Sequence, residues 1–241
     1  METYLHNLID WATLNDMQLN TTKTKEMILG PVARANLPLL TTTTTATTTG
    51  TDTINRVTSF KLLGVYIDST MSWTIHVDNM VKKATRRLYF LKQLKRSGLT
   101  SKQLFHYYIA VIRPVLEYCA PVWHYALTKS QTQQLEAIQK RAIQIVLNFS
   151  RGMPYTSMIF AADLDSLASR REDISRKFFQ DITKSTSCLH HLLPDPKLPS
   201  YRPNSRLRSY EKFPRPYTRT KQYCSFVQYA LTHYQDREYH A

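Results

Sequence analysis

The chain has 241 residues, with 32 Lys and Arg against 18 Asp and Glu, so its formal net charge is +14. Hydrophobic residues make up 42% and charged residues 21%, which is typical of a globular chain and excludes a largely disordered one. The excess of positive charge indicates a polyanionic partner, either nucleic acid or an anionic membrane surface.

The glycines and cysteines exclude several classes of site. No two of the five glycines lie closer than 14 positions, so the clustered glycines of a dinucleotide-binding loop, a Walker-type phosphate loop or a nucleophile elbow are absent. The three cysteines form no CxxC pair, which favours a reducing compartment. Without a signal peptide or a long apolar run, we expect an intracellular protein of the nucleus or cytoplasm, with no membrane partner.

The first part of the chain predicts short strands around a low-complexity loop. Apolar spacing over residues 4–15 predicts a helix, and residues 23–29 predict a strand that ends at Gly30. Ten threonines among the thirteen residues 41–53 leave no apolar face to bury and predict a surface loop. The dense apolar run of residues 60–68 predicts a buried strand, with Gly64 at a bulge.

Residues 74–96 predict an amphipathic helix that ends at Gly98. Its apolar stripe includes Val77, Met80, Ala84, Leu88 and Leu91. The other side carries seven cations and one anion, Asp78; the cations are Lys82, Lys83, Arg86, Arg87, Lys92, Lys95 and Arg96. A charge run is usually only a solvated face, but this imbalance favours contact with phosphates.

Further helices follow in the second half. Thr100 to Gln103 has capping-box spacing, and Pro114 is expected to interrupt the helix that begins there. Ser130 to Gln133 has the same spacing and predicts a third helix, with Lys140 and Arg141 at its exposed edge. Helices are also expected over residues 155–162 and 166–184, before a basic, aromatic and Pro-containing tail with a short helix near residues 225–234.

Six stretches in one order resemble the C-terminal part of a reverse transcriptase, the RNA-directed DNA polymerase of jockey-type non-LTR retrotransposons, which are transposable elements. They are residues 19–25 (LNTTKTK), 60–65 (FKLLGV), Ser72-Trp73 with His76, Lys82-Lys83-Ala84, residues 113–118 (RPVLEY) with 121–123 (PVW), and 135–142 (LEAIQKRA).

The resemblance implies an α+β fold with four regions. Residues 1–68 would be a partial palm edge that contains the Thr-rich loop 41–53. Residues 69–150 would be a helical thumb that holds a template–product duplex, residues 151–195 a helical extension, and residues 196–241 an irregular basic tail.

The chain departs from that family at the catalytic centre. Polymerisation needs Mg²⁺ ions held by clustered carboxylates, and no Asp-Asp pair occurs here. We therefore expect no enzyme activity from the chain alone, no cofactor and no bound metal. The expected function is that of a truncated retroelement fragment that binds RNA, DNA or a hybrid duplex. The expected nucleic-acid-binding residues are Lys23, Lys25, Lys61, Gly64, Lys82, Lys83, Arg86, Arg87, Lys92, Lys95, Arg96, Lys140 and Arg141.

Other interpretations stay open at this point. Lys23 or Lys25 could act as a general acid or be a solvent-facing lysine, and Gly64 could grip a primer or simply form a bulge. His76 is expected to pack beside Trp73 in a structural role. A helical protein-interaction module that docks a partner through exposed apolar surface is the alternative function. A third hypothesis is a polymerase whose missing palm is supplied by a partner chain.

Overall fold

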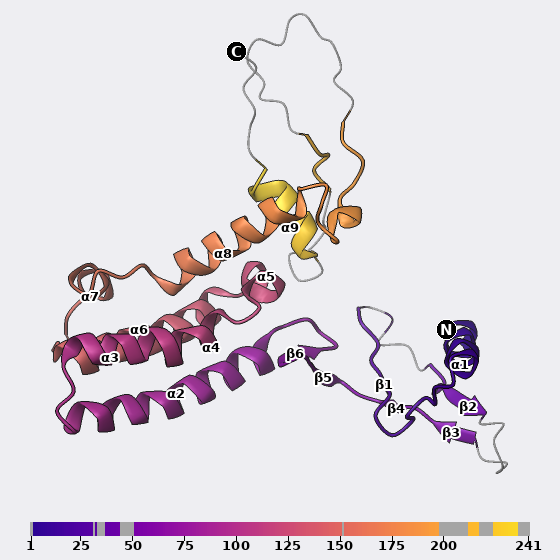
Figure 1. The fold of residues 1–241 in the computed structure, drawn as a ribbon, viewed down its shortest axis with the longest axis horizontal. Coiled ribbons are helices and arrows are strands. Elements are labelled where there is room, and N and C mark those ends of the chain that lie inside the picture. Colours follow the sequence, from indigo (N-terminus) through magenta and orange to yellow (C-terminus); the bar gives the residue numbers. More distant parts are fainter. Residues whose placement is uncertain are drawn as a thin grey trace, which may run out of the picture. The chain divides into compact units, whose positions relative to one another are not determined.

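The computed structural model describes residues 2–30, 32, 37–43, 51–150, 152–197, 212–216 and 224–235. The chain divides into two compact units, residues 1–71 and 72–241, and each is described here by itself (Figure 1). The first unit holds the short strands and the second is helical. The α+β class predicted from the sequence is confirmed.

The described residues of the first unit form one α-helix and three two-stranded sheets. Helix α1 spans Glu2–Leu14, close to the predicted 4–15. The strand predicted over residues 23–29 is only the two-residue β1 (Lys25–Glu26), which pairs in parallel with β4 (Asn55–Arg56). Arg56 holds this pair together, because its guanidinium donates to Glu26 at 2.8 Å and to the carbonyl of Leu37 at 2.8 Å.

The Thr-rich tract forms a strand at each end. β2 (Thr41–Thr43) pairs antiparallel with β3 (Thr51–Thr53), and residues 44–50 lie outside the described part of the chain. Threonine is β-branched and suits extended backbone. The expectation of a loop throughout residues 41–53 is therefore wrong at the two ends.

Residues 59–68 form a hairpin instead of the single strand predicted over 60–68. β5 (Ser59–Leu62) pairs antiparallel with β6 (Val65–Asp68), and Leu63 and Gly64 make the two-residue turn between them. Both turn residues have positive φ, 46° and 91°, as a type I′ hairpin turn requires. Gly64 therefore forms a turn and not a bulge.

The second unit is a set of packed helices. The helices are α2 (Thr74–Arg96), α3 (Ser101–Tyr107), the π-helix η2 (Tyr108–Ile112), α4 (Arg113–Glu117), α5 (Ala120–Trp123), the 3₁₀ helix η3 (His124–Ala126), α6 (Lys129–Leu147), α7 (Tyr155–Ala161), α8 (Leu167–Ile182), the 3₁₀ helix η4 (His190–Leu192) and α9 (Phe226–His233). Helix α2 packs against α4 and α6, and α8 packs against α5, α6 and α9.

The helix starts follow local side-chain chemistry. Thr100 caps α3 with a full capping box to Gln103, as predicted. The box at α6 joins Thr128 to Gln131, so this helix begins before the predicted Ser130. Gln131 also donates to the carbonyl of Ser72 at 2.9 Å, which fastens the start of α2 to the start of α6.

Pro114 follows a wide π turn, so the predicted interruption of this helix is confirmed. Every fourth residue through the turn is fully buried, from α3 to α4: Leu104, Tyr108, Ile112 and Leu116. In a regular α-helix each step of four residues advances about 40° around the axis, so such a series would leave the core. The π turn holds one more residue than an α-helical turn, which offsets this advance around the axis and lets the series stay buried.

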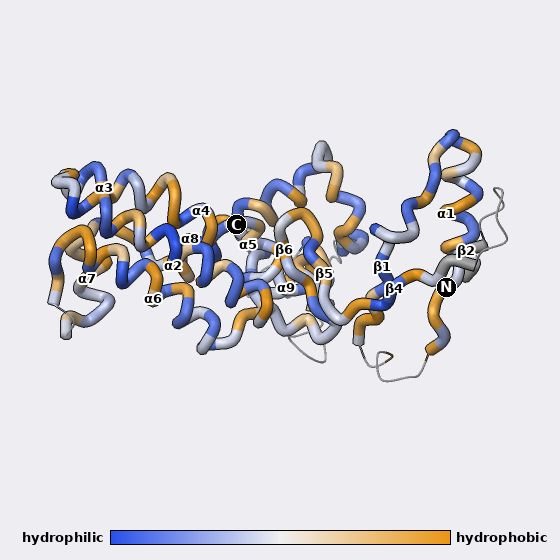
Figure 2. Tube along the Cα trace, turned by 90° about the horizontal axis from the view of Figure 1, so that it is seen from below, coloured by the Kyte–Doolittle hydropathy of each residue, from blue (hydrophilic) through white to orange (hydrophobic). Residues whose placement is uncertain are grey.

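Figure 2 shows apolar and polar positions alternating along α2 and α6. The apolar stripe of α2 is buried as predicted, and it faces a second stripe on α6 that includes Leu135, Ile138, Ala142 and Val146. Burial of these two stripes fixes the orientation of α2, and therefore fixes which of its residues face solvent.

The described parts of the tail belong to the fold. Helix α9 matches the helix predicted near residues 225–234. Phe213, Ala230, Leu231 and Tyr234 form a buried cluster with Phe179 of α8. Residues 212–216 form neither helix nor strand, but the apolar side chains of this part of the tail cover the end of α8.

Among the described residues, none of the helices has the length and apolar character that crossing a bilayer requires.

Candidate nucleic-acid interface

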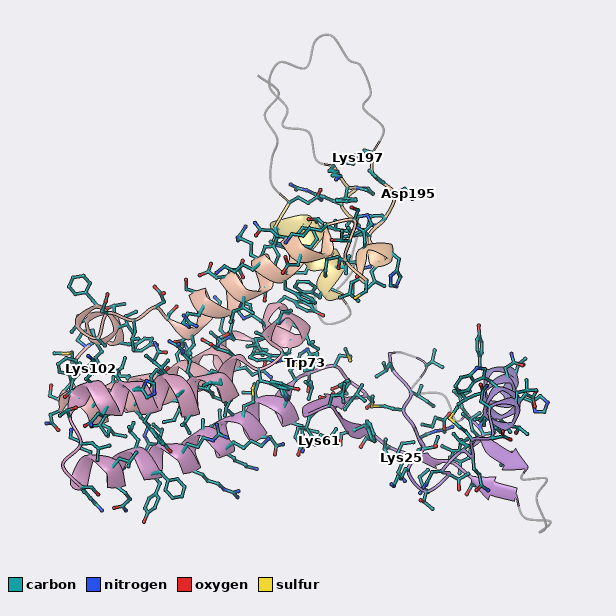
Figure 3. All side chains as sticks on the ribbon, viewed as in Figure 1. Lys25, Lys61, Trp73, Lys102, Asp195 and Lys197 are labelled. Carbon is teal, nitrogen blue, oxygen red and sulfur yellow. The ribbon has the colours of Figure 1, made fainter. Side chains whose placement is uncertain are left out.

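The solvent-facing side of α2 carries a cluster of positive charge. Five exposed cations lie there, and we call them the α2 basic surface: Lys82, Lys83, Arg86, Lys92 and Arg96. Lys82 and Arg86 are four residues apart and therefore neighbours on the helix. Figure 3 shows side chains projecting from α2 on the side away from α3 and α4. Asp78 is also exposed, near the start of the helix.

Two predicted binding residues on α2 make hydrogen bonds within the fold. Arg87 donates to the carbonyl of Val111 at the π-helix. Lys95 donates to the carbonyl of Ile145 and to the side chain of Asn148, which caps the end of α6. A cation at a helix C-terminus is favourable because unpaired carbonyls gather there. These two residues are therefore left out of the α2 basic surface.

Two aromatic rings lie among the cations, and sequence reasoning missed them. Tyr89 is 59% exposed and Phe90 57% exposed, and their ring centroids are 5.7 Å apart with the planes at 75°. Both rings are one helical turn from Arg86. The sequence did contain a signal for them. Helical spacing places both aromatic residues on the basic side of α2, outside its buried apolar stripe.

The remaining predicted binding residues lie elsewhere. On α6, Arg141 is exposed and Lys140 half-buried. The other four belong to the first unit, where Lys23 is exposed in a turn, Lys25 is half-buried in β1 and Gly64 is in the hairpin turn. Lys61 is exposed and lies 5.6 Å from the centroid of the Tyr66 ring. Their part in binding stays a prediction.

A half-buried carboxylate joins α6 to the start of α8. Glu136 of α6 accepts hydrogen bonds from the backbone N–H of Leu167 and Ala168, at 3.2 and 2.6 Å, at the start of α8. It also accepts from the hydroxyl of Tyr155 at 2.5 Å, and burial raises the pKa of that tyrosine. This is a carboxylate capping a helix N-terminus, so its role is structural.

Arg171 is a buried charge within the same region. It is fully buried, and its guanidinium lies 3.8 Å from Glu136 and 5.7 Å from the centroid of the Trp123 ring. Its Nε donates to Nδ1 of His124 at 3.4 Å. Burial lowers the pKa of Arg171, and the carboxylate of Glu136 opposes that shift. The cluster orders α5, α6 and α8 and is closed to a ligand by its burial.

His76 near the start of α2 packs as predicted. Its ring lies 6.1 Å from Trp73 and 5.5 Å from Trp123, both with tilted planes. Burial, with a smaller effect of Lys83, lowers the pKa of His76 to about 4. Within the described part of the chain, His, Cys, Asp and Glu side chains form no group that could hold a metal ion.

One protein family matches part of the second unit. Residues 73–113 match the family described as alkylated DNA repair protein alkB homolog 8, N-terminal. This stretch contains α2, α3 and η2, and therefore the whole α2 basic surface. No curated protein and no solved structure matches the chain.

The resemblance to a non-LTR retrotransposon reverse transcriptase is therefore wrong. The family match falls on the predicted thumb but names a different family, and nothing supports a polymerase fragment, a transposable element or a missing palm chain. The motifs misled because several of them, such as Lys82-Lys83-Ala84 and residues 135–142, are segments of amphipathic helices. The alternative of a helical protein-interaction module is not supported either.

Proposed function

We propose that this chain binds nucleic acid by its phosphate backbone, through the α2 basic surface. The observation that carries the proposal is the gathering of five exposed cations on one helix whose opposite side is fixed in the core. Lysine and arginine on a rigid helix place positive charge along a line, which suits a regularly charged polymer.

Two further observations support the proposal. The formal net charge of +14 attracts a polyanion over a long range and speeds association. The family that matches residues 73–113 is described by its role in repair of alkylated DNA, so the description of that family concerns a nucleic acid. The proposal assigns binding to this chain and no catalytic step.

The test is a titration of fluorescein-labelled oligonucleotides with the full chain over a salt series, read by anisotropy. The variant Lys82→Gln/Lys83→Gln/Arg86→Gln is expected to bind more weakly. Its slope of log affinity against log salt should be shallower by roughly 2 to 3, because each lost phosphate contact removes about 0.9 on a duplex.

A matched control removes the same charge from other helices. Lys102, Lys129 and Lys177 are exposed on α3, α6 and α8, and their triple replacement by Gln should leave the slope nearly unchanged. Equal weakening by both triple variants would show that only net charge matters. Absence of binding by the wild-type chain at low salt would refute the proposal outright.

A further inference from the structure

We infer that Tyr89 and Phe90 form a stacking platform for unpaired bases, so that the α2 basic surface takes single-stranded nucleic acid in preference to duplex. This inference rests on the proposed function and adds the kind of nucleic acid to it. A single strand has free base faces, and aromatic side chains stack on such faces without regard to sequence. In a duplex those faces are covered by neighbouring base pairs.

The position of the two rings shows that folding does not require them. The buried stripe of α2 lies on the other side of the helix, and both residues are more than half exposed. The two rings contact each other at a tilt, so they present differently oriented faces. Exposed aromatic rings set among cations are the arrangement by which proteins hold single strands.

The surrounding charge selects the partner. Arg86 lies one turn before both rings, and Lys92 lies one turn after Tyr89. An apolar protein surface would have to desolvate these cations, which is unfavourable without paired anions. A nucleic-acid strand supplies both an aromatic surface for the rings and an anion for the cations, because each nucleotide carries a base and a phosphate.

The experiment compares probes of equal length and two aromatic variants. The probes are 20-nucleotide oligo(dT) and oligo(rU), which do not pair with themselves, and a 20-base-pair duplex DNA. For Tyr89→Ala/Phe90→Ala, affinity for both single strands should fall about tenfold or more. Affinity for the duplex should change by less than about twofold, and the salt slope should stay as in the wild type, because the phosphate contacts are untouched.

Three controls keep the result interpretable. Phe160→Ala removes a ring that is 89% exposed on α7 and should leave binding unchanged. Tyr89→Phe should bind as the wild type does, because stacking needs the ring and not the hydroxyl. Phe90→Trp adds a fluorophore whose emission oligo(dT) should quench more strongly than duplex does. Far-ultraviolet circular dichroism checks that each variant is folded.

Each outcome decides between the two proposals. Equal loss of single-strand and duplex binding in the double alanine variant, or no loss at all, would overturn the platform. If the double alanine variant loses no binding, the salt series with the charge variants still tests the proposed function independently. Loss of single-strand binding alone, with quenching in Phe90→Trp, would establish the platform. Tighter wild-type binding to oligo(rU) than to oligo(dT) would assign the preferred ligand as RNA, and the reverse as DNA.

Discussion

At the scale of single residues, buried His76 links the start of α2 to the aromatic core. Its ring lies between Trp73 and Trp123. Burial holds its pKa near 4, against an ordinary value of 6.5, so the folded chain keeps this imidazole neutral. In the unfolded chain the same group takes a proton as the pH falls through 6.5. The proton therefore favours unfolding over this range.

We expect the free energy of unfolding to fall by about 2 kcal/mol between roughly pH 7 and pH 5 through His76 alone. The loss begins near the unfolded pKa of 6.5 and is complete below the folded pKa of about 4. Urea denaturation at several pH values measures it. His76→Phe keeps an aromatic ring in place and should flatten the curve over this range; an equally steep curve in that variant would assign the effect to other groups.

Residue types alone predicted part of the candidate site. The basic side of α2 was visible in the sequence, because helical spacing separates its cations from the apolar stripe. The roles of Arg87 and Lys95 were not visible, since their acceptors are backbone carbonyls far along the chain. Tyr89 and Phe90 were passed over because only the apolar stripe and the cations of this helix were given a role.

At the scale of elements, the start of α6 shows how closely two capping signals can compete. Thr128 and Ser130 each precede a glutamine by three positions, and only Thr128 forms the box. Gln131 is the partner in that box and also the residue that donates to Ser72. The earlier start therefore brings Gln131 toward α2. This contact between helices favours the cap at Thr128, and it cannot be predicted from the local spacing of capping residues.

Thr128→Ala should lower the free energy of unfolding by about 1 kcal/mol, because it leaves an N–H at the start of α6 unpaired. Ser130→Ala is the matched control and should change it by only a few tenths, since Ser130 is exposed within the first turn. Thermal or urea denaturation measures both variants. A larger loss from Ser130→Ala would place the cap where the sequence first suggested it.

Helices were predicted better than strands. The 23 residues of α2 carry several turns of consistent apolar spacing, and the predicted bounds agree with the structure. The strands are two to four residues long, too short for a period of two to be distinguished from a plain apolar run. In residues 60–68 the turn pair Leu63-Gly64 lacked the usual Asn or Asp, so the hairpin was read as one strand.

At the scale of the whole molecule, the C-terminal residues contribute to the core of the second unit. Tyr234 is buried against Phe179, and its hydroxyl donates to Glu172 of α8 at 3.0 Å. Arg176 lies over the Tyr234 ring at 4.9 Å. A tail rich in Pro, Tyr and Arg thus supplies packing that composition alone did not predict.

Tyr234→Ala should therefore destabilise the second unit by about 3 to 4 kcal/mol through loss of a buried ring. Tyr234→Phe should cost only about 1 kcal/mol, because it removes one hydrogen bond and keeps the packing. Urea denaturation followed by circular dichroism separates the two, and Phe160→Ala serves as the exposed-ring control. If Tyr234→Ala unfolds as the wild type does, the tail adds nothing to the core.

The π turn at Tyr108–Ile112 has a consequence for how this chain tolerates change in length. The turn lets buried side chains recur at intervals of four on either side of Pro114. Removal of one residue from the turn would restore ordinary winding and leave eleven steps between Leu104 and Leu116, so these two side chains would still lie within about 20° of each other around the axis. Leu116 would then stay on the buried side, whereas ordinary winding with every residue kept would turn it away by about 100°. The π turn therefore accommodates a single extra residue, and the loss of that residue would leave the buried series in place.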